Sequence, residues 1–300
     1  MIEVKNAVKN FDDIVAVNDV SVDIREGSIF GLVGTNGAGK STLLRMLCGI
    51  LKADKGSISV DGEDVFENPS IKENIYYISD DQYYIKNYTP KDIMKYTASF
   101  YPNFDKERYN YLINTFGLPY IRKINNFSKG MKKQLSVILG VCANTKYILC
   151  DETFDGLDPV MRQAVKSLFA NDMQKRGLVP VIASHNLREL EDICDRVGLL
   201  YKGGILFARD LDDMKLNMHK VQCVLPEGFD LAKLRELLDV VTLETRGKLI
   251  TFTARGSREE TEQKIASFEP VFYELIPLTL EEIFISETGV RGYDIGKIIL

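Results

Sequence analysis

The sequence predicts an α/β fold with a mostly parallel sheet, followed by a smaller α+β domain, and three observations support this prediction. An apolar run at Ile29–Val33 leads through a glycine-rich loop into a helical segment. Strand-like and helix-like segments then alternate from Lys129 to Ala208, which is typical of a parallel sheet covered by helices. Nearer the C-terminal end the order changes to β-α-β-β-α-β. We therefore expect domains at residues 1–212 and 213–300.

The elements of the first domain follow from the spacing of apolar residues. Alternation with period two and short apolar runs predict strands, whereas spacing of three and four residues predicts helices, with Gly49 as a helix end. The expected strands are Met1–Phe11, Ile14–Ile24, Ile29–Val33, Ser57–Val60, Ile75–Ser79, Tyr147–Cys150, Val179–Ala183, Val197–Tyr201 and Gly204–Ala208. The expected helices are Ser41–Cys48, Pro90–Tyr101, Asp105–Phe116, Lys129–Ala143, Pro159–Lys175 and Leu187–Cys194.

The second domain is predicted from the same kinds of pattern, after a linker near residues 209–219 that places His219 on the surface. Its order of elements suggests a small ferredoxin-like domain. Ser257 with Glu260, and Thr279 with Glu282, are spaced as helix capping boxes. The expected strands are Lys220–Leu225, Val240–Glu244, Leu249–Thr253 and Val271–Leu275, and the helices are Asp230–Leu238, Ser257–Phe268 and one that begins at Thr279.

Composition limits the class of protein. Apolar residues make up 45% of the 300 residues and charged residues 27%, which is ordinary for a soluble globular protein. The net charge of −5 argues against a nucleic-acid partner. The five cysteines lack metal-ligand spacing, which fits a reducing compartment. We see no signal peptide and no apolar run of about 18 residues, so a membrane role would require a partner chain.

The strongest motif is the glycine-rich loop, which matches G-x-x-x-x-G-K-[ST] between a predicted strand and a predicted helix. Its glycines let backbone N–H groups surround phosphate oxygens, and the helix N-terminus adds a positive dipole end. In this motif the lysine reaches the β- and γ-phosphates and the first hydroxyl binds Mg²⁺. The predicted nucleotide-binding residues are Gly34, Thr35, Asn36, Gly37, Ala38, Gly39, Lys40, Ser41 and Thr42, with Ser41 also a metal ligand.

An acidic pair, Asp151 and Glu152, ends the apolar strand at Tyr147–Cys150. Alone, such a pair is more often two solvated acids at a strand end. With a phosphate-binding loop upstream, Asp151 is expected to reach the Mg²⁺ ion and Glu152 to polarise an attacking water. The predicted catalytic residues of these two motifs are therefore Glu152 and Lys40.

The order of these motifs over residues 1–210 resembles the ATP-binding subunit of an ABC transporter. The segment from Asn126 to Met131 stands where this family has its LSGGQ-type signature, and Gly156-Leu157-Asp158 matches its D-loop. His185 follows a strand where the family has its switch histidine. A lone histidine there is usually a packing or hydrogen-bonding residue, but the resemblance implies that His185 is catalytic and contacts the γ-phosphate and the attacking water. The resemblance implies a mixed-sheet core, an antiparallel β subdomain and a helical subdomain at about residues 80–145. It also implies ATP and Mg²⁺ as cofactors.

In this family two such domains close head to tail, and each ATP lies between the P-loop of one copy and the signature of the other. The resemblance therefore adds Ser128, Gly130, Met131 and Asp158 to the predicted nucleotide contacts. Ser128 taken by itself would be an ordinary helix cap. The second copy can be the same chain or a different one.

Two further matches leave alternatives open. Phe11 stands where the family places an aromatic ring that stacks on adenine, although a core phenylalanine at a strand end fits the pattern nearly as well. The family's Q-loop glutamine, a metal ligand, should follow the strand Ile75–Ser79. Asp80 occupies that place and Gln82 lies two residues later, and either one could supply an oxygen to Mg²⁺.

The resemblance implies a cytoplasmic ATPase subunit that is held at the inner face of the cell membrane by a separate permease. Ten of the 14 tyrosines lie between Tyr76 and Tyr120, either as the core of the helical subdomain or as an apolar groove for a permease helix. Details such as Asp80 and the segment 277–284 further resemble ABC-2-type exporters, in which the C-terminal domain could support the dimer, regulate it or only stabilise the fold.

Two other classes of protein are alternatives to the transporter. One is a soluble ABC-type ATPase that acts on a ribosomal, DNA or assembly partner, but the chain has one cassette and no heptad repeat between Lys40 and Asp151. The other is a nucleotide-binding regulator without turnover. The presence of Glu152 and His185 argues against it.

Overall fold

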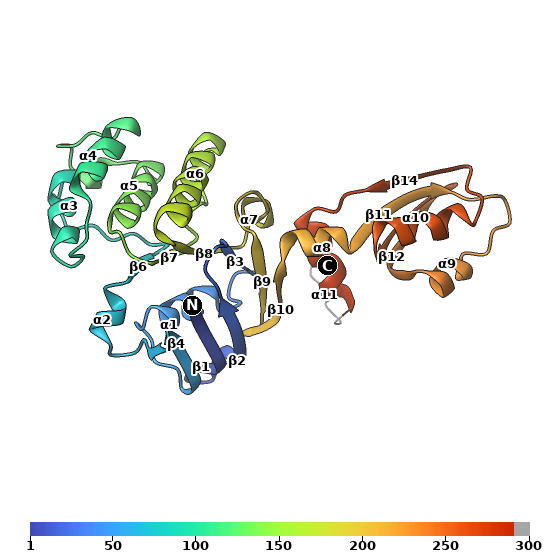
Figure 1. The fold of residues 1–300 in the computed structure, drawn as a ribbon, viewed down its shortest axis with the longest axis horizontal. Helices are drawn as coiled ribbons and strands as arrows, with labels where there is room; N and C mark the ends of the chain where they lie inside the picture. Colours follow the sequence, from blue (N-terminus) through green and yellow to red (C-terminus); the bar gives the residue numbers. More distant parts are fainter. Residues whose placement is uncertain (291–300) are drawn as a thin grey trace. The chain divides into compact units, whose positions relative to one another are not determined.

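The computed structural model describes residues 1–290. The chain forms two compact units, of which the first is Met1–Ala208 and the second begins at Arg209 (Figure 1). The sequence predicts this boundary after residue 212, and the last ten residues of the predicted 213–300 domain lie outside the described residues. No helix in the described part of the chain is long and apolar enough to cross a lipid bilayer.

A six-stranded sheet forms the centre of the first unit, in the order β10-β9-β3-β8-β7-β6. Strands β6, β7, β8, β3 and β9 pair in parallel. Strands β3, β7 and β8 are buried along their whole length, which explains their continuous apolar sequences. The strands are β3 (Phe30–Val33), β6 (Ile75–Ile78), β7 (Tyr147–Asp151), β8 (Val179–Ser184), β9 (Arg196–Tyr201) and β10 (Gly204–Asp210).

The register of this sheet determines where the predicted site lies. Val33 pairs with Ser184, and Asp151 pairs with Ala183. Because the carboxyl ends of neighbouring parallel strands meet at one edge, the loops after β3, β7 and β8 lie together. The sheet therefore brings the glycine-rich loop, the acidic pair and the histidine to the same edge.

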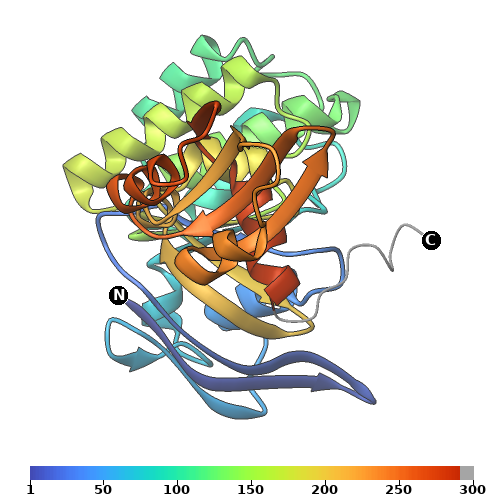
Figure 2. The same cartoon turned by 90° about the vertical axis from the view of Figure 1, so that its right-hand side faces the viewer.

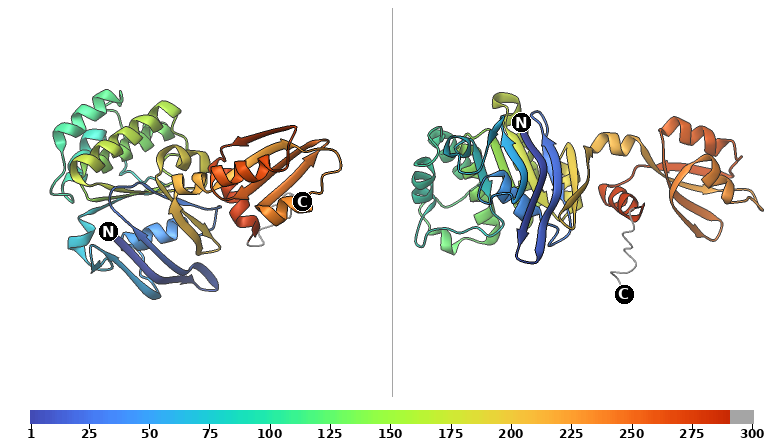
Figure 3. Two further views of the ribbon diagram at one scale, coloured as in Figure 1. Left: turned by 45° about the vertical axis from the view of Figure 1, so that its right-hand side comes forward. Right: turned by 90° about the horizontal axis from the view of Figure 1, so that it is seen from below.

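A second, antiparallel sheet has the order β2-β1-β4-β5, with β1 and β2 side by side along most of their length (Figure 3). Helix α1 connects the two sheets through a shared apolar core to which it contributes Leu43, Leu44, Met46 and Leu47. The elements are β1 (Ile2–Phe11), β2 (Ile14–Ile24), α1 (Lys40–Leu47), β4 (Lys55–Val60), β5 (Glu63–Asp64) and the short helix α2 (Pro69–Lys72).

The helical subdomain lies on the other side of the six-stranded sheet from β1, β2 and β4 (Figure 1). Side-chain caps at Thr89 and Asp105 begin its first two helices. Asp172, which is buried, accepts two hydrogen bonds from Arg108 at 2.7 and 3.0 Å and thus ties α4 to α6. The helices of this subdomain are α3 (Pro90–Ala98), α4 (Lys106–Thr115), the 3₁₀ turn Ile124–Asn126 and α5 (Lys129–Cys142). Helices α6 (Pro159–Arg176) and α7 (Leu187–Ile193) follow it in the chain.

The second unit contains an antiparallel sheet in the order β12-β13-β11-β14, connected as β11-α9-β12-β13-α10-β14 (Figure 2). One apolar core joins the sheet to helices α9 and α10. The ferredoxin-like classification of this unit stays a prediction. Its elements are α8 (Leu211–Leu216), β11 (Met218–Val224), α9 (Ala232–Leu237), β12 (Asp239–Arg246), β13 (Leu249–Arg255), α10 (Arg258–Ala266), β14 (Phe272–Ile276) and α11 (Leu280–Val290).

The expected linker is wrong in two respects. Helix α8 and the first residues of β11 occupy most of it. His219 is only 8% exposed, not on the surface, because it lies in β11 and pairs with Ala254 of β13. Burial lowers the pKa of its imidazole, which keeps the side chain neutral to lower pH than a solvated histidine.

Candidate active site

The glycine-rich loop connects β3 to α1 in a conformation that requires glycine at two positions. Gly39 has a φ of +104°, and a Cβ there would lie 2.2 Å from the carbonyl oxygen of Ala16. A Cβ on Gly34 would lie 2.5 Å from the carbonyl oxygen of Leu200. Both distances are far below a normal contact, so any side chain would displace the loop from its neighbours.

Lys40 is the first residue of α1, and its side chain is buried beneath this loop. Its ammonium group donates to the carbonyl oxygens of Gly34 at 2.8 Å and Thr35 at 3.3 Å. It also lies 3.2 Å from Oε1 of Glu152. A cation is thus held where the loop and the helix N-terminus would receive a phosphate.

Asp151 ends β7 and is almost fully buried. The Ser41 hydroxyl donates to its Oδ1 at 2.9 Å, and the Tyr77 hydroxyl donates to its Oδ2 at 2.9 Å. Burial raises the pKa of the Asp151 carboxyl, and these two hydrogen bonds oppose that rise by favouring the charged form. Ser41 and Asp151 therefore place one hydroxyl and one carboxylate side by side, which are hard oxygen donors of the kind that bind Mg²⁺.

Glu152 occupies the position between the loop and the histidine. Its Oε2 lies 2.8 Å from Nδ1 of His185, while its Oε1 faces Lys40. The backbone at Glu152 is left-handed, with a φ of +46°, and its N–H donates to the carbonyl oxygen of Ala183 at 2.9 Å. Such a conformation is uncommon for a residue with a long side chain, and with it the carboxylate lies between Lys40 and His185.

His185 follows β8 in a turn that is fixed by side-chain hydrogen bonds. Ser184 accepts the N–H of Asn186 at 3.0 Å and contacts Oε2 of Glu189 at 3.3 Å. Burial raises the pKa of Glu189, which Arg162 opposes from 3.3 Å. This network holds the main chain, so that the imidazole extends from the sheet edge toward Glu152.

The stretch Thr153-Phe154-Asp155, which departs from the family pattern, has a packing explanation. Phe154 is buried and forms an edge contact with Phe169 of α6, with ring centroids 6.2 Å apart and an interplanar angle of 75°. The buried hydroxyl of Thr153 donates to the carbonyl oxygen of Asp151 at 3.3 Å. These contacts anchor the chain just after the acidic pair.

The residues around the signature cap helices within this chain. Ser128 accepts the N–H of Met131 at 3.2 Å at the start of α5, and Asp158 accepts the N–H of Met161 at 2.9 Å at the start of α6. A Cβ on Gly130 would lie 3.8 Å from the carbonyl oxygen of Gly156, so the signature and the D-loop are neighbours. Their predicted contacts with a nucleotide remain predictions.

The Q-loop candidates contact helix α5. The Asp80 side chain is 58% exposed and lies 3.7 Å from the ammonium group of Lys133. The amide of Gln82 donates to the Ser136 hydroxyl at 2.7 Å.

Phe11, at the tip of the β1–β2 hairpin, is 43% exposed, with the Lys9 ammonium 5.7 Å from its ring centroid. It is therefore not the core residue that one of the two alternatives describes, and its ring is accessible.

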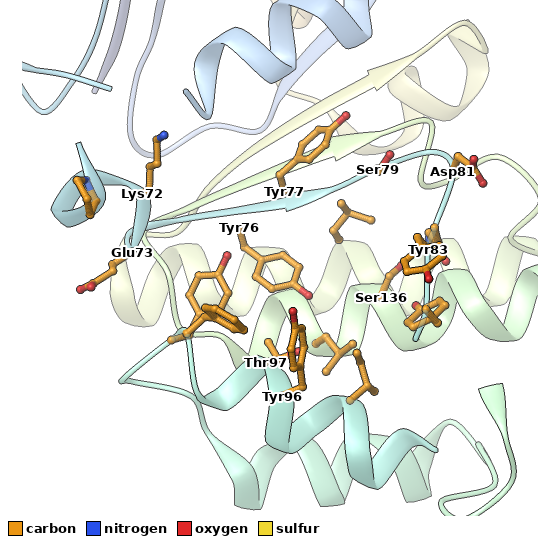
Figure 4. A pocket seen from close by; sticks show the side chains of 18 residues that line it. Lys72, Glu73, Tyr76, Tyr77, Ser79, Asp81, Tyr83, Tyr96, Thr97 and Ser136 are labelled. Atoms are coloured by element: carbon orange, nitrogen blue, oxygen red, sulfur yellow. The ribbon is translucent and has the colours of Figure 1, made fainter. Parts of the chain in front are cut away.

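A cavity of about 750 Å³ lies between β6, α3 and α5 (Figure 4). Tyr76 and Tyr77 point to opposite sides of β6, and only the Tyr76 side chain points toward α3 and α5 (Figure 4). Tyr109 is fully buried elsewhere in the helical subdomain, so the tyrosine-rich block serves both as core and as cavity wall. The aromatic residues that line the cavity are Tyr76, Tyr77, Tyr83, Tyr84, Tyr96, Phe100 and Tyr101.

Two residues at the site were not predicted from the sequence. Tyr77 reaches Asp151 from β6, and Lys133 donates to the carbonyl oxygen of Glu152 at 2.6 Å from α5. The alternation of Tyr76 and Tyr77 along a strand would have indicated that they face opposite sides. Nothing local marks Lys133, which is one of several lysines near the start of its helix.

Comparisons with known proteins identify the family of the chain. A family model described as "ABC transporter" matches residues 17–155. The ABC transporter ATP-binding protein YtrB of Bacillus subtilis is 35% identical over 96% of this chain and 98% of its own length. The lipopolysaccharide export system ATP-binding protein LptB of Haemophilus influenzae is 30% identical over 76% of this chain and 98% of its own length.

Solved structures give the same result for the fold. The ATP-binding subunit of an ABC transporter superimposes with a TM-score of 0.66 at 25% identity, over 72% of this chain and 92% of that one. A bacterial ABC transporter cassette that was solved as a dimer superimposes with a TM-score of 0.64 at 20% identity, over 70% of this chain and 99% of that one. At this identity the likeness supports the fold alone. The chain therefore belongs to the ATP-binding proteins of ABC transporters, and it is an ATP hydrolase.

Proposed function

We propose that this chain is the ATP-hydrolysing subunit of an ABC exporter, that it works as a head-to-tail dimer, and that it drives a separate membrane permease. The observation that carries the catalytic part is the position of Glu152 between Lys40 and His185. Relatives named for bacitracin and lantibiotic transport support the exporter assignment. A Glu152→Gln variant tests the catalytic part, and we expect it to lose ATP hydrolysis while it still binds ATP.

The described residues fit ATP and Mg²⁺. The loop Gly34–Gly39 and the N-terminus of α1 would surround the phosphates, and Lys40 would neutralise them. Ser41 and Asp151 would hold Mg²⁺, which neutralises charge on the phosphate oxygens when it is bound. Glu152 accepts a proton from the attacking water, and His185 holds the Glu152 carboxylate in place through the 2.8 Å contact.

The signature residues complete the site of a second copy. Ser128 and Gly130 begin α5, a helix of 14 residues, so a hydroxyl, backbone N–H groups and a positive dipole end would face a γ-phosphate bound to the other subunit. Asp158, at the start of α6, is exposed in the single chain and would contact the same partner. Closure of the dimer would then depend on ATP at both interfaces.

The aromatic cavity between β6, α3 and α5 is the proposed contact with the permease. Phe100 and Tyr96 are exposed at its rim, with ring centroids 5.0 Å apart. Aromatic side chains are enriched at protein interfaces because they cover large areas with few rotatable bonds. A short permease helix would place the chain at the inner face of the cell membrane.

Phe100→Glu introduces a charge at this rim and tests the permease contact. We expect the fraction of the chain that sediments with membranes of its native cells to fall about tenfold, since burying an unpaired carboxylate at an interface is costly. Tyr111→Glu, at an exposed aromatic residue of α4, is the matched control and should remain with the membranes. Unchanged sedimentation of Phe100→Glu would exclude the cavity as the contact, and a wild-type chain found only in the soluble fraction would favour the soluble ATPase.

Tyr77→Phe tests the metal assignment of Asp151. The change removes the hydroxyl that donates to Oδ2, and partners of this kind usually contribute about 10- to 100-fold to metal affinity. We expect roughly tenfold more Mg²⁺ to be needed for half-maximal ATP hydrolysis. A Mg²⁺ titration of activity, with Tyr111→Phe as control, measures this. An unchanged requirement would contradict a role for Asp151 at the metal.

A further inference from the structure

Helix α5 sends one basic side chain into the active site. Lys133, five residues after Ser128, donates from its ammonium group to the main-chain carbonyl oxygen of Glu152 at 2.6 Å. The same ammonium group lies 3.7 Å from Oδ1 of Asp80, in the loop after β6. The Lys133 side chain is only 13% exposed, so its ammonium group is largely shielded from bulk water, whereas the Asp80 side chain is 58% exposed. Three segments therefore meet at a single cation.

The contact matters because of the conformation of Glu152. Its φ of +46° is unfavourable for a side chain of this kind, so the surrounding structure must hold it. On one side the N–H of Glu152 is bonded to Ala183 of β8. On the other side Lys133 is bonded to the Glu152 carbonyl oxygen. Together these hydrogen bonds hold the peptide groups before and after the Cα of Glu152. The carboxylate extends from that Cα toward Lys40 and His185.

We propose that Lys133 is a positioning residue for ATP hydrolysis, and that Asp80 acts through it. In this arrangement the lysine orients the Glu152 main chain, and Asp80 keeps the ammonium group over the carbonyl oxygen. Asp80 thereby has a use that needs no contact with a metal ion. The inference rests on the proposed catalytic role of Glu152. It also connects the helix that begins at the signature to the residue that activates water.

The arrangement predicts a specific effect on kinetics. A shift of Glu152 by a fraction of an ångström should slow proton transfer without removing any group that contacts the nucleotide. Loss of Lys133 should therefore lower kcat and leave the KM for ATP nearly unchanged. A lysine that only tied α5 to the sheet would instead change the melting temperature and leave kcat unaltered.

The test compares Lys133→Met, Lys133→Arg and Asp80→Asn with the wild-type chain. We expect kcat of Lys133→Met to fall at least about tenfold with KM within about threefold, because misplacement of a reacting group is costly. Lys133→Arg keeps a charged donor and should restore most of kcat, and Asp80→Asn should lose less than Lys133→Met. Lys132→Met removes the same charge one residue earlier on α5 and serves as the matched control.

A double variant separates this inference from the assignment of Glu152. If Lys133 acts through Glu152, then Lys133→Met should cause no further loss in a Glu152→Gln background, where the base is already absent. A kcat of Lys133→Met within twofold of wild type, alongside loss of activity in Glu152→Gln, would overturn the inference alone. Full activity of Glu152→Gln would overturn the catalytic assignment instead. Melting temperatures of all variants show whether a lost activity is only unfolding.

Discussion

The Glu152→Gln protein is expected to lose ATP hydrolysis by about 10²- to 10⁴-fold, the range that a general base contributes. Glutamine has nearly the shape of glutamate, so it can fill the space between Lys40 and His185, but its amide cannot take a proton from water. ATP should still bind, because the loop and Lys40 are unaltered. Steady-state phosphate release and binding of a fluorescent ATP analogue measure the two quantities separately.

The same variant also tests the proposed dimer. With hydrolysis blocked and Mg²⁺ and ATP present, the closed state should accumulate, and size-exclusion chromatography should show a dimer that is absent without nucleotide. Glu107→Gln, at an exposed carboxylate near the start of α4, should behave like the wild type in both assays. Hydrolysis by Glu152→Gln at more than half the wild-type rate would refute the assignment of the base.

Replacing Lys40 with Met is expected to weaken ATP binding by about 10- to 100-fold. Methionine keeps the length of the side chain but removes the cation. Hydrogen bonds that involve a charged group contribute about 1.5–3 kcal/mol each, and about 1.4 kcal/mol corresponds to a factor of ten in affinity. The variant also leaves the carboxylate of Glu152 without its partner at 3.2 Å. Titration calorimetry with ATP measures the change.

Lys91→Met, at an exposed position near the start of α3, removes an equal charge outside the site and should bind ATP like the wild type. Because Lys40 is buried, the melting temperature of Lys40→Met must be measured beside the affinity. An unaltered dissociation constant in a folded Lys40→Met protein would show that the phosphates do not lie at this loop.

Sequence reasoning predicted those parts of the fold and of the site that depend on neighbours in the chain. The strand β7 and the helix α5 are where the apolar pattern places them. Asp151 and Glu152 could be assigned different roles because they follow an apolar strand in a chain with a phosphate-binding motif upstream. The buried position of His219 was missed because the sequence pattern between 209 and 219 is interrupted by polar residues, while the burial comes from pairing with β13.

The sequence by itself determined the order of the elements, and it predicted the phosphate-binding loop and the roles of Glu152, Lys40 and His185. Only the tertiary structure decided which side chains meet: Tyr77 reaches Asp151 across 74 positions of the chain, and Lys133 reaches Glu152 across 19. The reason is physical. Periodicity and capping depend on residues that are close together in the sequence, so they can be recognised from the sequence. The order of strands in the parallel sheet and the packing of α5 on it bring residues that are distant in the sequence within hydrogen-bond distance.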